Sequence, residues 1–195
     1  MAIDTYHSQK RGGVGVNATN TIEDDVIKDM YIAKNLDTLL IFTTKGKVFA
    51  IKVYEIPETG KQARGKLINN LIKLSEDEKV STIIKVRAHD EDNRELFFIT
   101  KKGIVKKTEA RLFFHINKNG IRALTLKGED ELTYVGLTSG TKKNEVFIAT
   151  RAGFAIRFSE EDVRSMGRTA AGVKGINLRK DDFVVSAAIV NPETD

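Results

Sequence analysis

The chemistry most evident in the sequence is that of cationic side chains that recur with a repeated unit. In two copies of the unit, Lys101 and Arg151 stand two residues before a turn glycine, and Lys107 and Arg157 stand four residues after it. A further basic residue lies in or beside each of four glycine-containing segments: Arg11, Arg64, Arg122 and Lys174. Glycine lets backbone N–H groups approach a phosphate while neighbouring lysine and arginine neutralise it. The pattern predicts a basic stripe for an extended polyanion; the competing interpretation is ordinary solubilising charge on exposed strands.

Other combinations of reactive residues do not form a recognisable site. Carboxylates cluster at 23–25, 90–92 and 160–162, and we interpret them as solvated turn residues because nothing nearby would desolvate them and shift their pKa values. Residues 13–18 fit the loose dinucleotide pattern G-x-G-x-x-A, but no hydrophobic strand precedes them and no helix follows. No nucleophile motif such as G-x-S-x-G is present. We therefore predict no catalytic residue, no metal site and no cofactor for this chain.

Composition narrows the class of protein further. The chain has 195 residues, of which 41% are hydrophobic and 30% charged, which excludes a disordered tail. It has no cysteine, so disulfide scaffolds and thiolate zinc sites are excluded. Its net charge of +5 is compatible with a polyanionic partner. No apolar run approaches the ~18 residues that span a bilayer and no signal peptide opens the chain, so we expect a cytoplasmic protein without a membrane partner.

Three β-hairpins are predicted to position the basic residues. Each consists of an apolar run, a turn with glycine and a second run, at 39–48, 96–105 and 146–155. A threonine aligns at 43, 100 and 150, and a glycine aligns at 46, 103 and 153. β-Branched and aromatic residues favour strands, and the glycine supplies the positive φ of the turn.

A second series of residues recurs every 52 positions. The apolar members are Ile22, Leu74, Leu126 and Leu178, and the acidic members are Asp25, Asp77, Glu129 and Asp181. Each acidic turn is followed by another apolar run, at 26–27, 80–84, 132–137 and 183–190. Four strands per unit are typical of a propeller-like blade. Helix is expected only as short turns, one at 159–164 with Ser159 as its N-cap and a second candidate at 108–111.

The glycine segment at 9–15, QKRGGVG, resembles the signature box QRRGGKG of the C-terminal domain of the bacterial DNA gyrase A protein. Further segments are similar to that domain in the expected order: 52–57, 103–108, 156–164 and 166–175. The resemblance implies an all-β fold, the β-pinwheel, in which neighbouring four-stranded blades exchange strands and duplex DNA wraps around a basic rim. On this basis we expect one repeat domain of three to four blades within a larger C-terminal domain, with units at about 9–60, 61–115, 116–167 and 168–195.

The resemblance also implies a function. The parent would be the ATP-dependent type II topoisomerase that introduces negative supercoils in the bacterial cytoplasm, close to the nucleoid. This domain would be its non-catalytic DNA-wrapping part, while the catalytic tyrosine, ATP and Mg would belong to other domains. Its partners would be double-stranded DNA, the gyrase A catalytic domain and gyrase B in an A2B2 holoenzyme. The DNA-binding residues expected from the box and the repeat are Gln9, Lys10, Arg11, Gly12, Gly13, Gly15, Arg64, Lys101, Lys107, Arg151, Arg157, Arg168 and Lys174.

Two departures from the box leave alternatives open. Lys10 replaces an arginine and loses the guanidinium fork, and Val14 replaces a lysine and removes one charge. The C-terminal domain of the related topoisomerase IV A protein often lacks the motif, so a degenerate box leaves that DNA-binding domain as an alternative. A protein-interaction propeller is a third possibility, and it would bind its partner through an apolar patch and independently of salt.

Overall fold

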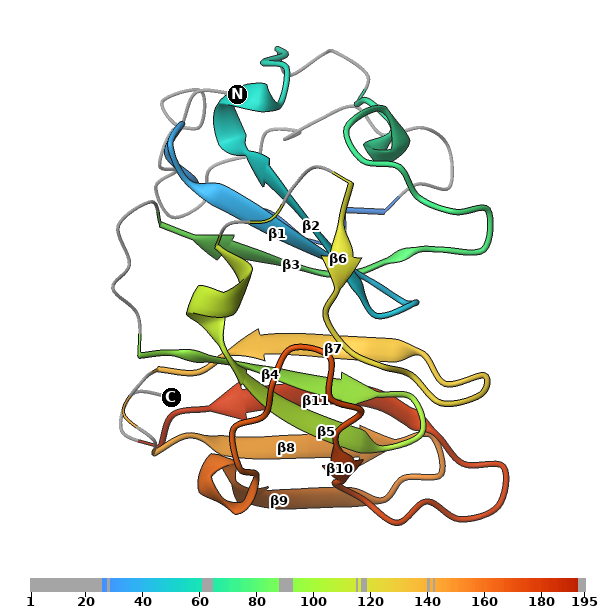
Figure 1. Ribbon diagram of the computed structural model, residues 1–195. Coiled ribbons are helices and arrows are strands. Elements are labelled where there is room, and N and C mark those ends of the chain that lie inside the picture. The colour runs from blue at the N-terminus through green and yellow to red at the C-terminus, as the bar shows by residue number, and fades with distance from the viewer. Residues whose placement is uncertain are drawn as a thin grey trace, which may run out of the picture.

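Three antiparallel sheets make up the part of the chain that the computed structural model describes, which is residues 26–27, 29–60, 65–87, 93–114, 116, 119–139, 141 and 143–192 (Figure 1). Sheet A contains, in spatial order, β3 (Val80–Val86), β1 (Thr38–Thr43), β2 (Lys47–Lys52) and β6 (Ile121–Arg122). Sheet B contains β10 (Val173–Lys174), β5 (Ile104–Glu109), β4 (Glu95–Thr100) and β7 (Leu132–Leu137). Sheet C contains β11 (Val184–Val190), β8 (Glu145–Thr150) and β9 (Ala155–Ser159). Short 3-10 turns connect them: η2 (Val53–Glu55), η3 (Ile68–Asn70), η4 (Ala110–Phe113) and η5 (Glu160–Asp162).

The three predicted hairpins are confirmed as β1–β2, β4–β5 and β8–β9. Their turn glycines have φ values of 73°, 77° and 83°, in the left-handed region that favours glycine. The aligned threonine also has a structural role, because its Oγ1 accepts a hydrogen bond from the backbone N–H four residues later. The three N···O distances are 3.3, 3.1 and 3.3 Å. Each threonine therefore closes the turn that the glycine permits.

Neighbouring sheets exchange strands, as the resemblance implied. β6 lies between β5 and β7 in sequence, yet it pairs with β2 and forms the edge of sheet A. β10 lies between β9 and β11, yet it pairs with β5 and forms the edge of sheet B. A repeat unit therefore supplies strands to more than one sheet. Sheets A and B have the predicted four strands, and sheet C has three in the described part of the chain.

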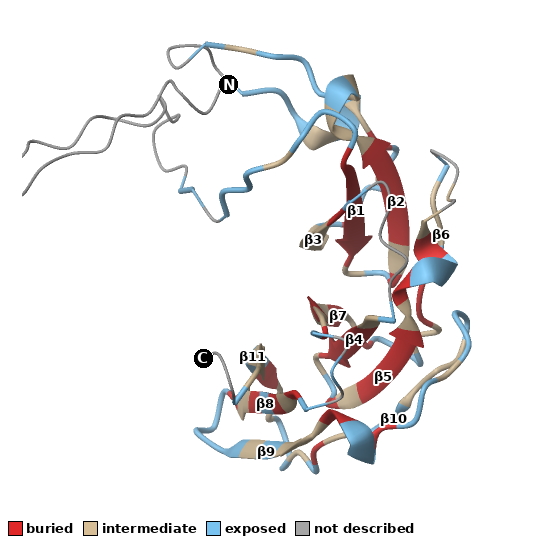
Figure 2. Ribbon diagram, turned by 90° about the vertical axis from the view of Figure 1, so that its left-hand side faces the viewer, coloured by how far each residue is buried: buried red, intermediate tan, exposed pale blue. Residues whose placement is uncertain are grey.

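The sheets follow an arc, with β3, β7 and β11 on its concave side and β6 and β10 on its convex side (Figure 2). Apolar side chains fill the space between successive sheets. Phe42 from sheet A and Phe98 from sheet B meet edge to face, with ring centroids 5.6 Å apart, and Phe113 packs against both. A second core joins Phe97 of sheet B to Val146 and other apolar residues of sheet C. The curvature of the arc is therefore fixed by how one sheet packs on the next.

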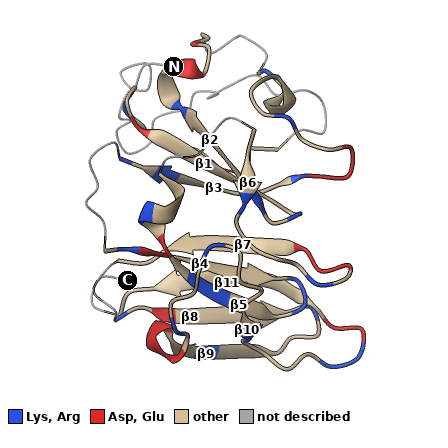
Figure 3. Ribbon diagram, in the orientation of Figure 1, with Lys and Arg blue, Asp and Glu red and all other residues tan. Residues whose placement is uncertain are grey.

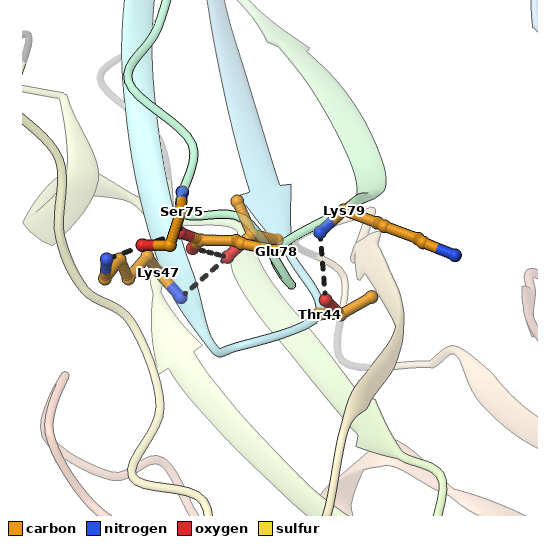
Figure 4. A network of polar contacts seen from close by, with 6 residues as sticks. Thr44, Lys47, Ser75, Glu78 and Lys79 are labelled. Carbon is orange, nitrogen blue, oxygen red and sulfur yellow. Dashed lines mark hydrogen bonds and ion pairs between the residues drawn. The ribbon is translucent and has the colours of Figure 1, made fainter. Parts of the chain in front are cut away.

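The three acidic turns in the described part of the chain each bind the hairpin beside them, through the residue that follows the acidic position predicted from the sequence. Glu78 accepts hydrogen bonds from Thr43 Oγ1 at 2.5 Å and from Ser75 N at 3.2 Å, and it pairs with Lys47 Nζ at 3.3 Å (Figure 4). Asp130 and Asp182, at the same 52-residue interval, each accept two backbone N–H groups at 2.9 Å. The periodic carboxylates thus fix each of these hairpin turns to the turn that leads into the neighbouring strand of the same sheet.

Two further expectations on local structure are refined. Ser159 does cap η5, because its Oγ accepts the N–H of Glu161 at 3.2 Å. The second turn begins at Ala110 rather than at Thr108, and no side chain caps it. Val26 and Ile27, expected to belong to a strand, are in none. In the described residues no helix is long and apolar enough to cross a membrane.

Candidate nucleic-acid interface

The two exchanged strands carry one exposed cation each at equivalent positions. Arg122 on β6 lies opposite Lys47 of β2, and Lys174 on β10 lies opposite Ile104 of β5. Both side chains belong to exposed residues. Because β6 and β10 form the convex side of the arc, these two charges lie on its outer edge (Figures 2 and 3).

A glycine before each exchanged strand allows the backbone to lie in contact with the sheet that the strand joins. Gly120 and Gly172 have φ values of 73° and 85°. A Cβ at Gly120 would lie 2.6 Å from the Phe49 ring, and a Cβ at Gly172 would lie 2.5 Å from the carbonyl oxygen of Val105. A side chain at either position would therefore push the cation-bearing strand off the sheet, which explains why the glycine and the cation recur together.

Arg168 lies in a tight loop just before β10. Ala170 N donates to Gly167 O at 3.1 Å, and Met166 N donates to Lys107 O at 2.8 Å, so the loop is folded against sheet B. Arg168 itself is exposed. Among the described residues, no carboxylate lies within ion-pair distance of Arg168, and the same holds for Arg122 and Lys174. These three cations form what we call the outer-edge set.

Lys101 and Arg151 lie close together at the end of sheets B and C where the β4–β5 and β8–β9 hairpins turn. The Nζ of Lys101 lies 5.4 Å from the centroid of the Phe183 ring, and the Cζ of Arg151 lies 5.6 Å from it. Lys101 also pairs with Glu131 at 3.0 Å, and both members of that pair are about half exposed. Part of the positive charge predicted here is thus balanced by a neighbouring carboxylate.

Lys107 and Arg157 occupy the same repeat position but lie in different environments. Lys107 is 5% exposed, and its Nζ pairs with Glu95 at 3.2 Å and donates to the carbonyl of Glu160 at 2.9 Å. Arg157 is exposed and pairs with Glu145 at 3.2 Å. The difference arises because sheet C packs on the face of sheet B that carries Lys107. Its charge therefore ties two blades together instead of facing solvent.

Two residues show what the sequence did not indicate. Arg122 belongs to the repeat but was not among the predicted DNA-binding residues, and its place on an exchanged strand puts it in the outer-edge set. Its spacing of 52 residues from Lys174, a predicted DNA-binding residue, could have indicated this from the sequence. Glu160 corrects the expectation of solvated carboxylates at 160–162, because it is 1% exposed and accepts the Asn144 side-chain amide at 2.7 Å. Glu161 and Asp162 are exposed as expected.

The box residues Gln9, Lys10, Arg11, Gly12, Gly13 and Gly15, together with Arg64, lie outside the described residues.

One cleft lined by described residues does not suit a polyanion. A cleft at the junction of sheets B and C interleaves basic side chains such as Arg94 and Arg164 with acidic ones such as Glu109 and Glu161. In the described part of the chain, no group of three histidine or carboxylate side chains is arranged to hold a metal ion.

An arc of strand-exchanged antiparallel blades with cations on its outer edge defines a β-pinwheel, a propeller-like class of domain. The sequence profile described as "DNA gyrase C-terminal domain, beta-propeller" matches residues 1–34, 37–87, 94–139 and 144–191. The chain therefore belongs to the DNA gyrase C-terminal domain family.

Sequences and solved structures agree with this assignment. The chain is 49% identical over 177 residues to the DNA gyrase A protein of Halalkalibacterium halodurans. The aligned region covers 91% of this chain and 21% of that protein. Among solved structures it is similar to a C-terminal domain of DNA topoisomerase IV, with a TM-score of 0.74 and 34% identity over 80% of this chain and 48% of that one. It is also similar to a DNA gyrase A C-terminal domain, with a TM-score of 0.68 and 25% identity over 97% of this chain and 60% of that one. The chain spans about a fifth of the length of the gyrase A protein that it matches.

Proposed function

We propose that this chain binds duplex DNA along the convex edge of its arc and bends the DNA around it, as the DNA-wrapping domain of a gyrase A protein. The observation that carries the proposal is the equivalent placement of two exposed cations, Arg122 on β6 and Lys174 on β10. Arg168 adds a third charge beside β10. A duplex that follows the edge would meet such charges at sheets A and B.

Phosphate neutralisation supplies the binding energy in this proposal. A bend of 40–90° over a short site costs on the order of 1–6 kcal/mol, so several cations must contact phosphates to offset it. The affinity should fall steeply with salt, because each contact releases condensed counterions. Sequence preference should be weak, since cations that address the backbone carry no base readout.

The other predicted residues take different places in the proposal. Arg151 is exposed and extends the contact beyond the outer-edge set, whereas Lys101 and Arg157 share their charges with Glu131 and Glu145. We assign Lys107 to blade packing because Glu95 neutralises it inside the protein. The family resemblance supports Gln9, Lys10, Arg11, Gly12, Gly13 and Gly15 as DNA contacts, and the recurrence of a basic residue beside each glycine segment supports Arg11 and Arg64.

In the parent enzyme, wrapping would serve negative supercoiling. The domain would present a positively crossed DNA segment to the cleavage site, where strand passage driven by ATP inverts the crossing. The breakage tyrosine, the ATPase and Mg would be supplied by the gyrase A catalytic domain and by gyrase B in an A2B2 assembly. Topoisomerase IV is the alternative parent: a gyrase A parent is supported by the matching gyrase family profile and the 49% identity to a gyrase A protein, whereas among the two solved structures the topoisomerase IV domain is the more similar, at 34% identity against 25%.

A protein-interaction role is the second candidate function. It is favoured by the apolar side chains of Phe147, Phe154 and Val185, which are 39%, 40% and 50% exposed on or beside sheet C. Such a surface would bind its partner with little dependence on salt, in contrast to a phosphate-binding edge.

Ligation of nicked circular DNA in the presence of the chain tests the proposal directly. After removal of the protein, wrapped DNA should yield circles whose linking number has shifted toward positive values in proportion to the amount of protein. Binding to a minicircle should also be tighter than binding to a linear duplex of the same length. An unchanged topoisomer distribution at saturating protein would contradict wrapping.

A further inference from the structure

Sheet B contains a buried lysine at a position that is apolar in the other two hairpins. Lys106 on β5 aligns with Phe49 on β2 and Ile156 on β9. Its exposed fraction is 0%, and burial together with the nearby charge of Arg168 lowers the pKa of its ammonium to about 8. Burying a charge is unfavourable unless polar partners compensate. The replacement of an aromatic or aliphatic side chain by lysine therefore requires specific contacts.

Those contacts join two segments that cross between blades. The Nζ of Lys106 donates to the carbonyl of Ala123 at 2.6 Å and to the carbonyl of Arg168 through a short hydrogen bond. It also lies 5.0 Å from the centroid of the Phe98 ring, where the π face favours a cation. Ala123 directly follows β6, and Arg168 precedes β10. One ammonium thus holds both segments that lead to or from an exchanged strand.

The loop 166–170 has few other attachments among the described residues. Its first residue is held by Lys107 O, and its end is held by Thr125, whose Oγ1 donates to Thr169 O at 2.6 Å. Between these points lie Gly167 and the exposed Arg168. Lys106 binds the backbone directly beneath the Arg168 side chain.

We propose that Lys106 is a positioning residue for DNA binding, whose buried ammonium fixes the 166–170 loop so that Arg168 is aligned with Arg122 and Lys174 on the outer edge. This inference rests on the proposed function, in which Arg168 contacts phosphate. Lys106 itself is enclosed by protein and does not contact DNA. Its positive charge matters because a charged donor forms stronger hydrogen bonds to carbonyl oxygens than a neutral one.

The first test measures the loop without DNA. Lys106→Met keeps the length of the side chain and removes the ammonium. Tryptic cleavage after Arg168 and amide exchange in residues 167–172 should both accelerate, by roughly 10- to 100-fold, as expected for the loss of a hydrogen bond to a charged group. The matched control is Lys102→Met, which removes one exposed charge from the same hairpin and should leave both rates unchanged. If Lys106→Met lowers the folded fraction, Lys106→Gln, which keeps a neutral donor, is compared on folded protein.

The second test measures duplex affinity in a double-mutant cycle. Arg168→Ala should weaken binding, and adding Lys106→Met should cause little further loss, because both changes remove the same contact. Unchanged cleavage and exchange in Lys106→Met would overturn the positioning role regardless of DNA binding, and so would additive losses in the cycle. A loosened loop combined with full affinity in Arg168→Ala would instead show that the proposed phosphate contact, not the anchor, is at fault.

Discussion

Neutralising the outer-edge set should reduce both the affinity for duplex DNA and its dependence on salt. The variant carries three substitutions: Arg122→Gln, Arg168→Gln and Lys174→Gln. Each lost phosphate contact lowers the slope of log K against log salt by about 0.9, so three lost contacts lower it by about 2.7. Between about 50 and 200 mM salt, the affinity of the unmodified chain should therefore fall about 40-fold more than that of the variant. Fluorescence anisotropy with a labelled linear duplex, titrated at several salt concentrations, measures both slopes.

A matched control separates the edge from bulk charge. Substituting three exposed lysines near the turn end, Lys45, Lys79 and Lys102, by glutamine removes the same net charge. This control should keep most of the slope of the unmodified chain. Exposed substitutions change stability by about 0.5 kcal/mol or less each, so both variants should melt near the original temperature. Equal reductions of slope in the two variants would refute a localised edge, and an unaltered slope in the edge variant would refute its contact with phosphate.

Further predictions concern the elements that support the edge. Gly172→Ala should weaken the pairing of β10, because its Cβ would lie 2.5 Å from Val105 O at a φ of 85°; faster amide exchange of β10 at unchanged global melting would show this. Folding lowers the pKa of Lys106 to about 8, so the unfolded chain binds more protons between pH 8 and the ordinary value of 10.5. The free energy of unfolding should therefore rise with pH in this window, by at most about 1.4 kcal/mol per pH unit, and urea titrations should find this rise absent in Lys106→Met. Burial raises the pKa of Glu78, but hydrogen bonds from Thr43 and Ser75 and the charge of Lys47 outweigh it and lower the pKa below 4.5. The carboxylate thus contributes stability above that pH which is lost as the pH falls through the lowered pKa, and Glu78→Gln should flatten this acid limb in the same titrations.

Local patterns in the sequence predicted the hairpins because their causes are local. The aligned threonine and glycine act within one turn, so residues such as Thr100 and Gly103 indicate the same structure in every copy. The exchange of strands depends instead on which blade receives a two-residue segment. Nothing in the composition of Ile121–Arg122 or Val173–Lys174 specifies that choice, and it was expected only from the family resemblance.

The candidate site was predictable to the extent that repeat position determines environment. It does so for Arg122 and Lys174, which share a place on equivalent edge strands. It does not for Lys107 and Arg157, because sheet C covers the first. The burial of a residue depends on which side chains of the neighbouring blade cover it. Aligning the repeat units with one another gives no information on that packing. The inward roles of Lys106 and Lys107 therefore follow from the packing of neighbouring blades and not from the repeat.

Strand exchange couples the spacing of the outer-edge cations to the packing of the interior. Arg122 is held on sheet A by β6, while the residue after it, Ala123, is bound by Lys106 of sheet B. Lys174 is likewise held on sheet B, although its segment continues to β11 of sheet C. The backbone that carries either cation is thus tied to two sheets, and cores such as the Phe42–Phe98 contact resist a shift of one sheet against the next. If DNA follows this edge, its curvature is set by side chains that never touch it, so a change in the interblade core should alter the bend of bound DNA even where every phosphate contact is kept.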